Sequence, residues 1–429
     1  MYNTIFYIIL AVLVFDFLLE RFLEYLNTKA WSPELPEVLK GIYDETKYHR
    51  SQQYYKANLK LGIFSSTLSF LLILMMLFFG GFAWVDQLAR HFGENEIIVS
   101  LVFFGLLGLA FDLIMTPFSL YDTFVIEEKF GFNKTTLKTF VSDKLKGWLL
   151  IALIGGGLLA LIIWFYQLTG NLFWIWAWIL AAVFMIFLSM FYSSLIVPLF
   201  NKQTPLKEGE LKKAISDLCH RAGFTLNNVY VIDGSKRSTK ANAYFSGLGK
   251  KKRVVLYDTL INDLETDEIV AVLAHEIGHY KKKHTLTGIM LSVLQTGLTF
   301  WLFSLFVGSP QLSQALGAEQ SSFHLGLIAF GIIFSPVSTI LGLGSAILSR
   351  RHEFQADAFA AAHSDARKLG SALFKLSVNN LSNLTPHPLY VFFHYSHPPL
   401  LERLRALGIN KLPDHPEEKY KNSTSKCND

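Results

Sequence analysis

Long apolar stretches recur along the chain and alternate with shorter polar segments. Each stretch has roughly the 20 residues that an α-helix needs to cross about 30 Å of hydrocarbon. The first stretch lacks a basic leading segment and a small-residue cleavage site, so we expect it to be retained rather than removed as a signal peptide. The pattern predicts seven membrane-spanning helices, at residues 5–26, 61–85, 97–121, 147–168, 172–197, 286–307 and 325–348.

The polar residues divide this pattern into four parts. We expect an N-terminal membrane region with five spans at 1–200, a polar domain at 201–284, two further spans at 285–348, and a helix with a C-terminal segment at 349–429. Alternating and 3.6-residue periodicities predict a small α+β fold for the polar domain. Its expected elements are a helix at 208–222, strands at 228–232, 241–246 and 253–257, a turn at 247–250, and a helix that begins with Thr266 as N-cap and ends at the lysines 281–283.

The composition agrees with a membrane protein. Of the 429 residues, 51% are hydrophobic and only 17% are charged, with a mean hydropathy of +0.33. A soluble domain carries about 25% charged residues, so an all-soluble chain is excluded. The 37 Phe, 17 Tyr and 8 Trp exclude a disordered chain. A net charge of +5 is too small to indicate a nucleic-acid partner, and the two cysteines cannot form a disulfide framework.

Lysine and arginine alternate between the loops. They gather between spans one and two, between spans three and four, in the polar domain and after the last span. The connection between spans two and three contains a single basic residue, Arg90. The positive-inside rule then predicts an N-terminus outside the cytosol and a cytosolic polar domain and C-terminus, in a bacterial inner membrane or the endoplasmic reticulum. Asp16, Glu20 and Asp112 lie within spans, and we expect them to line a polar chamber; for Glu20 a place at the membrane interface is an equal alternative.

The last helix of the polar domain contains an HExxH motif, His275 to His279. Residues i and i+4 lie on one helical face, so both imidazoles can bind one zinc ion, and Glu276 beside them can take a proton from a zinc-bound water. The alternative for the two histidines is a buried, hydrogen-bonded pair without a metal.

A catalytic zinc site needs a third protein ligand and an open position. Glu353 and Asp357 follow the last span and are also i and i+4, so on a helix they share a face. Glu353 can complete the site, while Asp357 can hydrogen-bond a ligand histidine or serve the chemistry itself. The alternative is an ordinary juxtamembrane helix with solvated charges.

Six blocks of sequence, in this order, carry a resemblance to a known family. The chain resembles the CAAX prenyl protease 1 family, zinc membrane endopeptidases that act on prenylated proteins. The resemblance implies His275, His279 and Glu353 as ligands of one zinc ion per chain, Glu276 as general base and Asp357 as a candidate proton donor. It also implies a mainly α fold, in which seven transmembrane helices form a barrel around a hydrated chamber that the zinc domain closes on the cytosolic side. The blocks are residues 121–135, 197–201, 241–245, 275–279, 353–357 and 395–399.

The same comparison suggests three further site residues. Asn242 lies on a strand that could pair with an extended substrate, and its amide could anchor the substrate backbone. His397 and Arg403 follow the ligand helix, and either could stabilise the oxyanion that forms on attack. A purely structural role is the alternative for each of the three. Four other histidines match no ligand spacing: His284, His363, His387 and His394.

Together these features predict a monomeric zinc endopeptidase of the lipid bilayer. Its expected substrate is a peptide or protein, and the resemblance implies removal of the aaX tripeptide from prenylated CaaX proteins. One alternative is a quality-control metalloprotease without prenyl specificity, and another is a seven-span transporter or receptor with a structural zinc. An intramembrane site-2-type protease is disfavoured, because that family places HExxH within a span and takes its third ligand from an Asp-Gly block.

Overall fold

Most of the molecule is built from long apolar helices. The computed structural model describes all residues except 1–2, 33, 36–42, 225–228, 248–251 and 410–429. Within the described residues, five helical segments are long and apolar enough to cross a membrane. They are Glu45–Phe78, Glu96–Glu127, Leu137–Leu199, His284–Ser304 and Phe323–His363.

The seven predicted spans compare with these five segments as follows. The spans expected at 147–168 and 172–197 both fall within Leu137–Leu199, which a short 3-10 turn at Gly170–Leu172 interrupts. The span expected at 5–26 falls on α1 (Thr4–Lys29), which carries five charged residues and is not among the five segments. The number of helices that cross the bilayer therefore stays a prediction.

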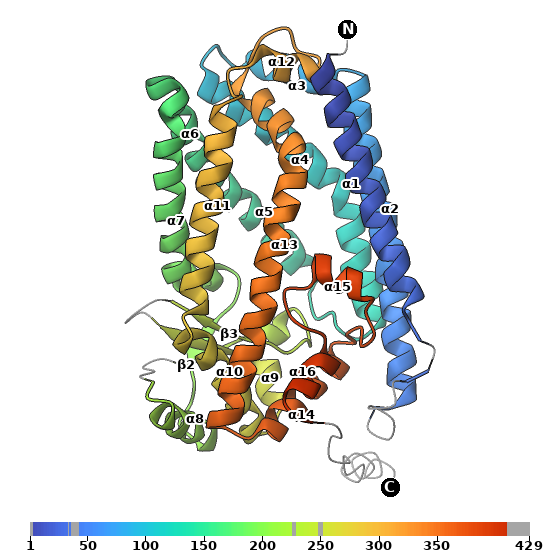
Figure 1. The fold of residues 1–429 in the computed structure, drawn as a ribbon, viewed down its shortest axis with the longest axis vertical. Helices are drawn as coiled ribbons and strands as arrows, with labels where there is room; N and C mark the ends of the chain where they lie inside the picture. The colour runs from blue at the N-terminus through green and yellow to red at the C-terminus, as the bar shows by residue number, and fades with distance from the viewer. Residues whose placement is uncertain (1–2, 33, 36–42, 225–228, 248–251, 410–429) are drawn as a thin grey trace.

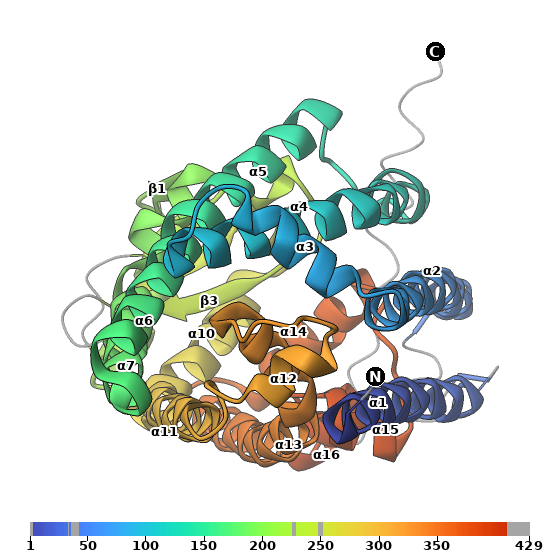
Figure 2. The same cartoon turned by 90° about the horizontal axis from the view of Figure 1, so that it is seen from above.

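The long helices stand side by side, and the strands and most of the short helices gather at one end (Figure 1). Seen from above, the helices follow one another around the perimeter, with α3 and α12 at the near end (Figure 2). Gly80, at a φ of +66°, ends α2 early and starts α3, so the predicted span 61–85 is two helices rather than one. This part of the chain comprises α1, α2 (Glu45–Phe78), α3 (Gly81–Arg90), α4 (Glu96–Tyr121), α5 (Leu137–Leu150), α6 (Gly156–Thr169), α7 (Phe173–Leu195), α11 (His284–Ser304), α12 (Pro310–Ala315) and α13 (Phe323–His363).

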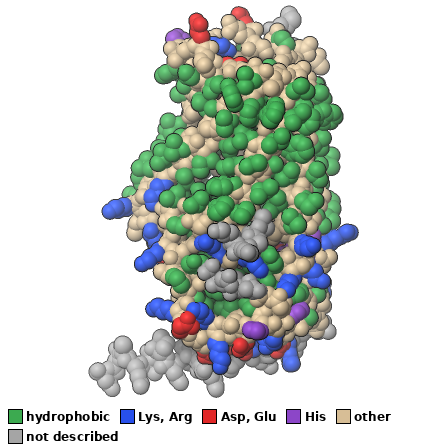
Figure 3. Space-filling model, turned by 90° about the vertical axis from the view of Figure 1, so that its left-hand side faces the viewer, with side chains coloured by type: hydrophobic (Ala, Val, Ile, Leu, Met, Phe, Trp, Pro, Cys, Tyr) green, Lys and Arg blue, Asp and Glu red, His purple; other side chains and the backbone are tan. Residues whose placement is uncertain are grey.

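The surface separates into an apolar band and a charged end. Hydrophobic side chains cover most of the face shown in Figure 3, and lysines and arginines gather toward the end that carries the short elements. Large apolar side chains such as Trp164 and Val183 are 47% and 61% exposed, which water would disfavour and lipid would not. This surface is that of a multi-pass membrane protein.

The three acidic residues within the predicted spans contact polar groups of the protein. Asp112 lies 2.7 Å from the ammonium of Lys144, and the indole Nε1 of Trp148 donates to it at 3.0 Å. Asp16 accepts a hydrogen bond from the hydroxyl of Ser335. The carboxylate of Glu20 lies 3.5 Å from His394 Nε2. Each acid is therefore partnered, as the cost of a lone charge in hydrocarbon requires.

The polar end contains one four-stranded sheet with short helices around it. The strand order is β1-β2-β4-β3, and only β2 and β4 are parallel. β3 lies at one edge, with Tyr244 opposite Val255 of β4. The elements are β1 (Gln203–Pro205), α8 (Glu210–Arg221), β2 (Val229–Ile232), β3 (Ala243–Ser246), β4 (Arg253–Tyr257), α9 (Asp258–Asp263), α10 (Thr266–Lys281), α14 (Ala366–Asn379), α15 (Pro388–His394) and α16 (Leu400–Ala406).

The periodicity of the polar domain predicted most of these elements. The strand expected at 253–257 is β4 to the residue, and the strand expected at 241–246 begins two residues late. Residues 229–232 of the strand expected at 228–232 form β2, and residue 228 lies outside the described part of the chain. β1 has three residues, too few for an alternating pattern to be visible, and the sequence did not predict it. Residues 248–250 of the expected turn lie outside the described part of the chain.

The N-cap of α10 was predicted wrongly by one residue. Glu265 is the cap rather than Thr266, because its backbone N–H donates to the carboxylate of Glu268 at 2.9 Å in a capping box. Glu268 is buried and also accepts from Ser371 and Lys375 of α14. The start of α10 is thereby fixed against α14.

α10 is held in place by a core that it shares with the sheet and α8. Its Ile269, Leu273 and Ile277 are at most 2% exposed and pack in one cluster with Leu218 of α8 and Leu256 of β4. Complete burial of each such side chain contributes about 1.5–3 kcal/mol to folding. The helix that carries HExxH is therefore rigidly supported.

The last predicted span and the helix after it are one continuous helix. α13 runs for 41 residues and continues past the predicted end of the span at 348 to His363. It crosses α10 closely at Gly278, where an added Cβ would lie 3.1 Å from the Cα of Ala356. A side chain at this position would push the two helices apart by a few tenths of an ångström, so glycine favours the close approach. Ala356 stands between Glu353 and Asp357 in the chain, so the crossing brings both acids to HExxH.

Candidate metal centre

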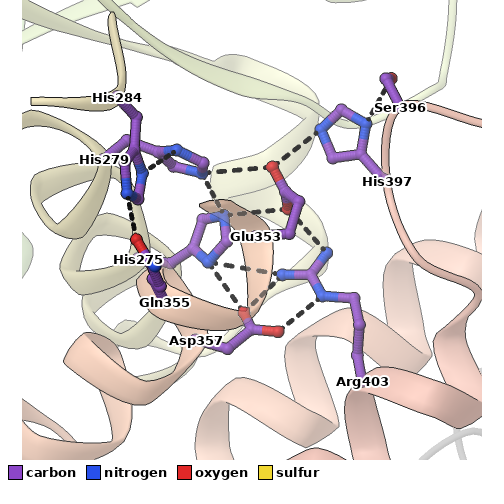
Figure 4. Close-up of polar contacts among 9 residues, drawn as sticks. All are labelled: His275, His279, His284, Glu353, Gln355, Asp357, Ser396, His397 and Arg403. Carbon is purple, nitrogen blue, oxygen red and sulfur yellow. Dashed lines mark hydrogen bonds and ion pairs between the residues drawn. The ribbon is translucent and has the colours of Figure 1, made fainter. Parts of the chain in front are cut away.

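Three predicted ligands converge from two helices. His275 and His279 project from one face of α10, and Glu353 faces them from α13 (Figure 4). The two Nε2 atoms are 3.0 Å apart. The carboxylate oxygens of Glu353 lie 3.5 Å from His275 Nε2 and 3.2 Å from His279 Nε2. One donor atom from each residue lies within 4.8 Å of the others, so the three can hold one metal ion.

The chemistry of these donors fits a zinc ion. Two imidazole nitrogens and one carboxylate are the protein ligands of one common class of catalytic zinc site. Glu353 Oε2 is buried and has no hydrogen-bond partner among the described residues. A buried carboxylate oxygen without a hydrogen bond is costly; the guanidinium of Arg403 approaches it only to 3.5 Å, and a metal ion bound to it would supply the missing partner.

Asp357 fixes the outer nitrogen of His275. Its Oδ1 lies 2.8 Å from His275 Nδ1, and only 1% of Asp357 is exposed. Arg403 of α16 donates to both oxygens of Asp357, from Nε at 2.8 Å and from Nη2 at 2.6 Å. The carboxylate therefore receives the Nδ1–H of His275, which leaves the Nε2 lone pair for a metal. Orientation of a ligand was one of the two roles expected for Asp357.

His397 and Arg403 approach the centre from different sides. His397 Nε2 lies 3.3 Å from Glu353 Oε1, and 64% of its side chain is exposed. Ser396 holds the other ring nitrogen of His397 at 2.9 Å. Arg403 is buried, and its Nη1 lies 3.5 Å from Glu353 Oε2. The exposed imidazole can reach a substrate, whereas the guanidinium lies behind the carboxylates.

Two neighbouring cavities open beside the centre. One, of about 350 Å³, is lined by Glu276 and His279, and the other, of about 720 Å³, is lined by Asn242 and by residues 244–246 of β3. Phe245 and Thr285 line both. Asn242 thus lies beside the sheet edge rather than against the metal ligands; its Oδ1 accepts from the N–H of Ala243 at 2.8 Å.

The surroundings of two side chains of α10, Glu276 and His275, shift their pKa values. Burial raises the pKa of Glu276, which moves this carboxyl toward the range of an effective general base at neutral pH. Burial disfavours a charged His275, but the hydrogen bond from its ring to Asp357 and the carboxylate of Glu353 at 3.5 Å outweigh that effect and raise its pKa to about 9. A metal ion at Nε2 must therefore displace a proton.

His284 lies beside the centre although its spacing in the sequence gave no signal. It is the first residue of α11, and its Nδ1 is 3.1 Å from His279 Nδ1. Lys283, at a φ of +61°, ends α10 and turns the chain back on itself. That left-handed residue is a lysine rather than a glycine, so the sequence did not reveal the turn.

Comparisons with known proteins match both parts of the chain. The family described as CAAX prenyl protease N-terminal, five membrane helices, matches residues 24–202, and Peptidase family M48 matches residues 205–409. A CAAX prenyl protease 1 homolog of Arabidopsis thaliana is 38% identical over 95% of this chain and 98% of its own length. CAAX prenyl protease 1 of Saccharomyces cerevisiae is 36% identical over 95% and 94%. The crystal structure of S. mikatae Ste24p superposes with a TM-score of 0.88, at 37% identity, over 94% of this chain and 99% of that one.

Proposed function

Because this chain belongs to the CAAX prenyl protease 1 family and is a membrane metalloendopeptidase, we propose that it uses zinc to remove the aaX tripeptide from prenylated CaaX proteins. The observation that carries the proposal is the convergence of His275, His279 and Glu353 beside Glu276. We further propose that it acts as a monomer in the endoplasmic reticulum membrane, the setting in which the prenyl anchor of such a substrate would lie.

His275, His279 and Glu353 would hold one zinc ion per chain. When bound, zinc supplies Lewis-acid activation of the attacking water and of the scissile carbonyl. Glu276 lines the smaller cavity beside these ligands, so its carboxylate accepts the proton of the attacking water and then passes it to the leaving amine. The raised pKa of Glu276 suits both steps, because the same group must take the proton and release it.

We assign the remaining site residues by their exposure. His397 is exposed at the open side of Glu353, which favours it as the residue that stabilises the oxyanion. Asp357 receives the ring N–H of His275 and is thus a positioning residue rather than a proton donor. Arg403 donates two hydrogen bonds to Asp357, which favours a positioning role for Arg403 as well, rather than direct contact with the substrate.

The edge of the sheet suggests how a peptide binds. Among the residues that the structure describes, β3 pairs with β4 alone and ends the sheet order. An extended peptide could add to that edge, as in other β-augmentation complexes, with the cavity of about 720 Å³ beside it for side chains. Asn242 stands immediately before β3 and could anchor the substrate backbone there.

We also propose a membrane arrangement. Seven helices would surround a hydrated chamber, with the metal centre at the cytosolic end and the N-terminus on the opposite side. The perimeter arrangement of the helices and the basic residues near the metal-bearing end favour this topology (Figures 2 and 3).

Cleavage of defined peptides tests the function. Purified protein is incubated with a farnesylated CaaX peptide and with its unprenylated counterpart, and product masses are read. We expect release of the tripeptide from the farnesylated peptide at the higher rate. Equal rates would favour a quality-control protease, and no cleavage by a zinc-loaded protein would favour a structural metal.

One substitution tests the general base. Glu276→Gln should retain zinc and lose about 10²–10⁴-fold in cleavage rate. Glu208→Gln is the matched control, since Glu208 is 87% exposed at a distance from the cavities. Unchanged cleavage by Glu276→Gln would remove Glu276 from the mechanism.

A further inference from the structure

A chain of three side chains leads away from the outer face of ligand His279. His279 Nδ1 lies 3.1 Å from His284 Nδ1, and the far nitrogen of His284, Nε2, lies 2.8 Å from Oε1 of Gln355 (Figure 4). His284 is only 6% exposed. The order is thus ligand, second imidazole, amide, with each link at hydrogen-bond distance.

The chemistry of each link fixes where the protons lie. The amide oxygen of Gln355 can only accept, so His284 carries its proton on Nε2. A neutral imidazole with Nε2–H has an acceptor at Nδ1, and that acceptor must receive the Nδ1–H of His279. His279 then has no proton on Nε2, which is the atom that faces His275 and Glu353.

We propose that His284 and Gln355 form a positioning relay that holds His279 in its metal-binding tautomer. The proposal rests on the zinc site proposed above and extends it to residues outside HExxH and outside the pair Glu353 and Asp357. Neither His284 nor Gln355 touches the metal position, so they act through His279 alone.

The relay explains why α13 carries three polar residues at alternating positions. Glu353 faces the metal position, Asp357 holds the Nδ1 of His275, and Gln355 reaches the Nδ1 of His279 through His284. One helix therefore supplies a ligand and the support for both other ligands.

Packing holds His284 in one orientation, while Gln355 is exposed and is fixed by its hydrogen bond. The ring of His284 stacks on the ring of His352, with centroids 3.9 Å apart and planes 7° from parallel. The turn at Lys283 sets the start of α11 and so the position of His284. A preorganised partner of this kind typically contributes about 10- to 100-fold to metal affinity.

If the hydrogen bonds of the relay ran in the opposite direction, His279 could not bind the metal. If the amide presented its NH₂ to His284, His284 would donate from Nδ1, and His279 would carry its proton on Nε2 where the metal must bind. The function of the relay thus depends on hydrogen-bond direction and not only on shape. Variants that preserve shape but not direction can separate the two.

Zinc affinity measured by chelator competition tests the relay. His284→Phe keeps a ring to stack on His352 but has no nitrogen, and we expect zinc affinity to fall about 10- to 100-fold. His284→Asn places an amide oxygen near the position of Nδ1, and we expect affinity within about threefold of wild type. Gln355→Met should also weaken zinc binding, whereas Gln355→Glu, which can only accept, should not.

The control is His363→Phe. His363 lies at the end of α13, where its ring stacks on Phe359 and contacts none of the described metal ligands. This substitution should therefore leave zinc affinity unchanged. Visible spectra of the cobalt-substituted proteins add a readout of ligand geometry: His284→Phe should change the d–d bands and His363→Phe should not.

The outcomes separate the relay from the zinc site itself. If wild-type protein binds no zinc, the proposed function fails. If wild type binds zinc and His284→Phe binds it equally tightly, the relay is refuted. Equal losses in His284→Phe and His284→Asn would also refute it, because shape rather than the acceptor would then matter. Should His284→Phe not fold, the comparison of Gln355→Met with Gln355→Glu decides in the same way.

Discussion

A methyl group added at Gly278 should push α10 and α13 apart. The Cβ of an alanine there would lie 3.1 Å from the Cα of Ala356, 3.1 Å from the Cβ of Phe359 and 3.2 Å from the carbonyl oxygen of Ala356. Ordinary contacts begin at 3.4 Å. Two of these atoms belong to the backbone, and Ala356 is fully buried, so no side chain can swing aside. The helices must separate by about 0.3 Å at this crossing.

The expected cost combines two opposing effects. Overpacking of a core costs about 1–3 kcal/mol, whereas replacing a helical glycine by alanine stabilises a helix by about 1 kcal/mol. We therefore expect Gly278→Ala to lower the free energy of unfolding by about 1 kcal/mol. Because the crossing sets the distance from Glu353 to the two histidines, zinc affinity should fall as well, by about tenfold.

Thermal unfolding in detergent and chelator competition measure the two effects. Gly342→Ala is the matched control, since Gly342 is likewise a helical glycine, in α13, and an added Cβ there meets no described atom within 4 Å. That variant should be as stable as wild type or slightly more stable. If Gly278→Ala matched the control in stability and held zinc as tightly as wild type, the close crossing would not be what sets the geometry of the site.

Two further predictions concern charged side chains, one pair between the polar domain and the membrane helices and one carboxylate in the site. Arg237 donates to both carboxylate oxygens of Asp143 of α5, at 2.7 and 2.9 Å, and so ties the polar domain to the membrane helices. Arg237→Met should lower the free energy of unfolding by about 1–3 kcal/mol. Arg237→Lys should restore less than half of that loss, since lysine cannot make the two parallel hydrogen bonds of a guanidinium. Unchanged melting of Arg237→Met would show that this contact does not stabilise the fold. Burial raises the pKa of Glu276 above its unfolded value, so in metal-free protein its ionisation lowers stability as pH rises through the folded-state pKa. Metal-free Glu276→Gln should thus unfold at a higher temperature than metal-free wild type at pH 7, with the difference vanishing as the pH falls toward about 4, and a difference independent of pH would contradict the assignment.

The sequence predicted the features that depend on local periodicity. Apolar runs located the long helices, and alternation located β4 to the residue. It missed β1, which has too few residues for a pattern, and placed the N-cap of α10 at Thr266, because the capping box of Glu265 and Glu268 competes with a residue of good intrinsic preference.

The candidate site divides in the same way. The spacing of His275 and His279 suffices to place two imidazoles together, because an α-helix brings i and i+4 to one face. Spacing could not include His284, because the turn at Lys283 uses a residue without the usual preference for a positive φ. Nor could spacing choose between the two roles expected for Asp357. The contacts of Asp357 with His275 and Arg403 favour the orientation of His275 over a direct part in the chemistry.

The sequence by itself determined that the chain lies in a membrane and that two histidines of one helix, with a glutamate beside them, can bind a metal. Both follow from short-range regularities, the length of apolar runs and the pitch of a helix. Only the tertiary structure decided which distant groups meet them. Glu353, Asp357 and Gln355 reach α10 because α13 continues beyond its apolar part and crosses at Gly278, where the absence of a side chain lets two backbones approach. Such a crossing depends on packing between segments far apart in the chain, which no local pattern encodes.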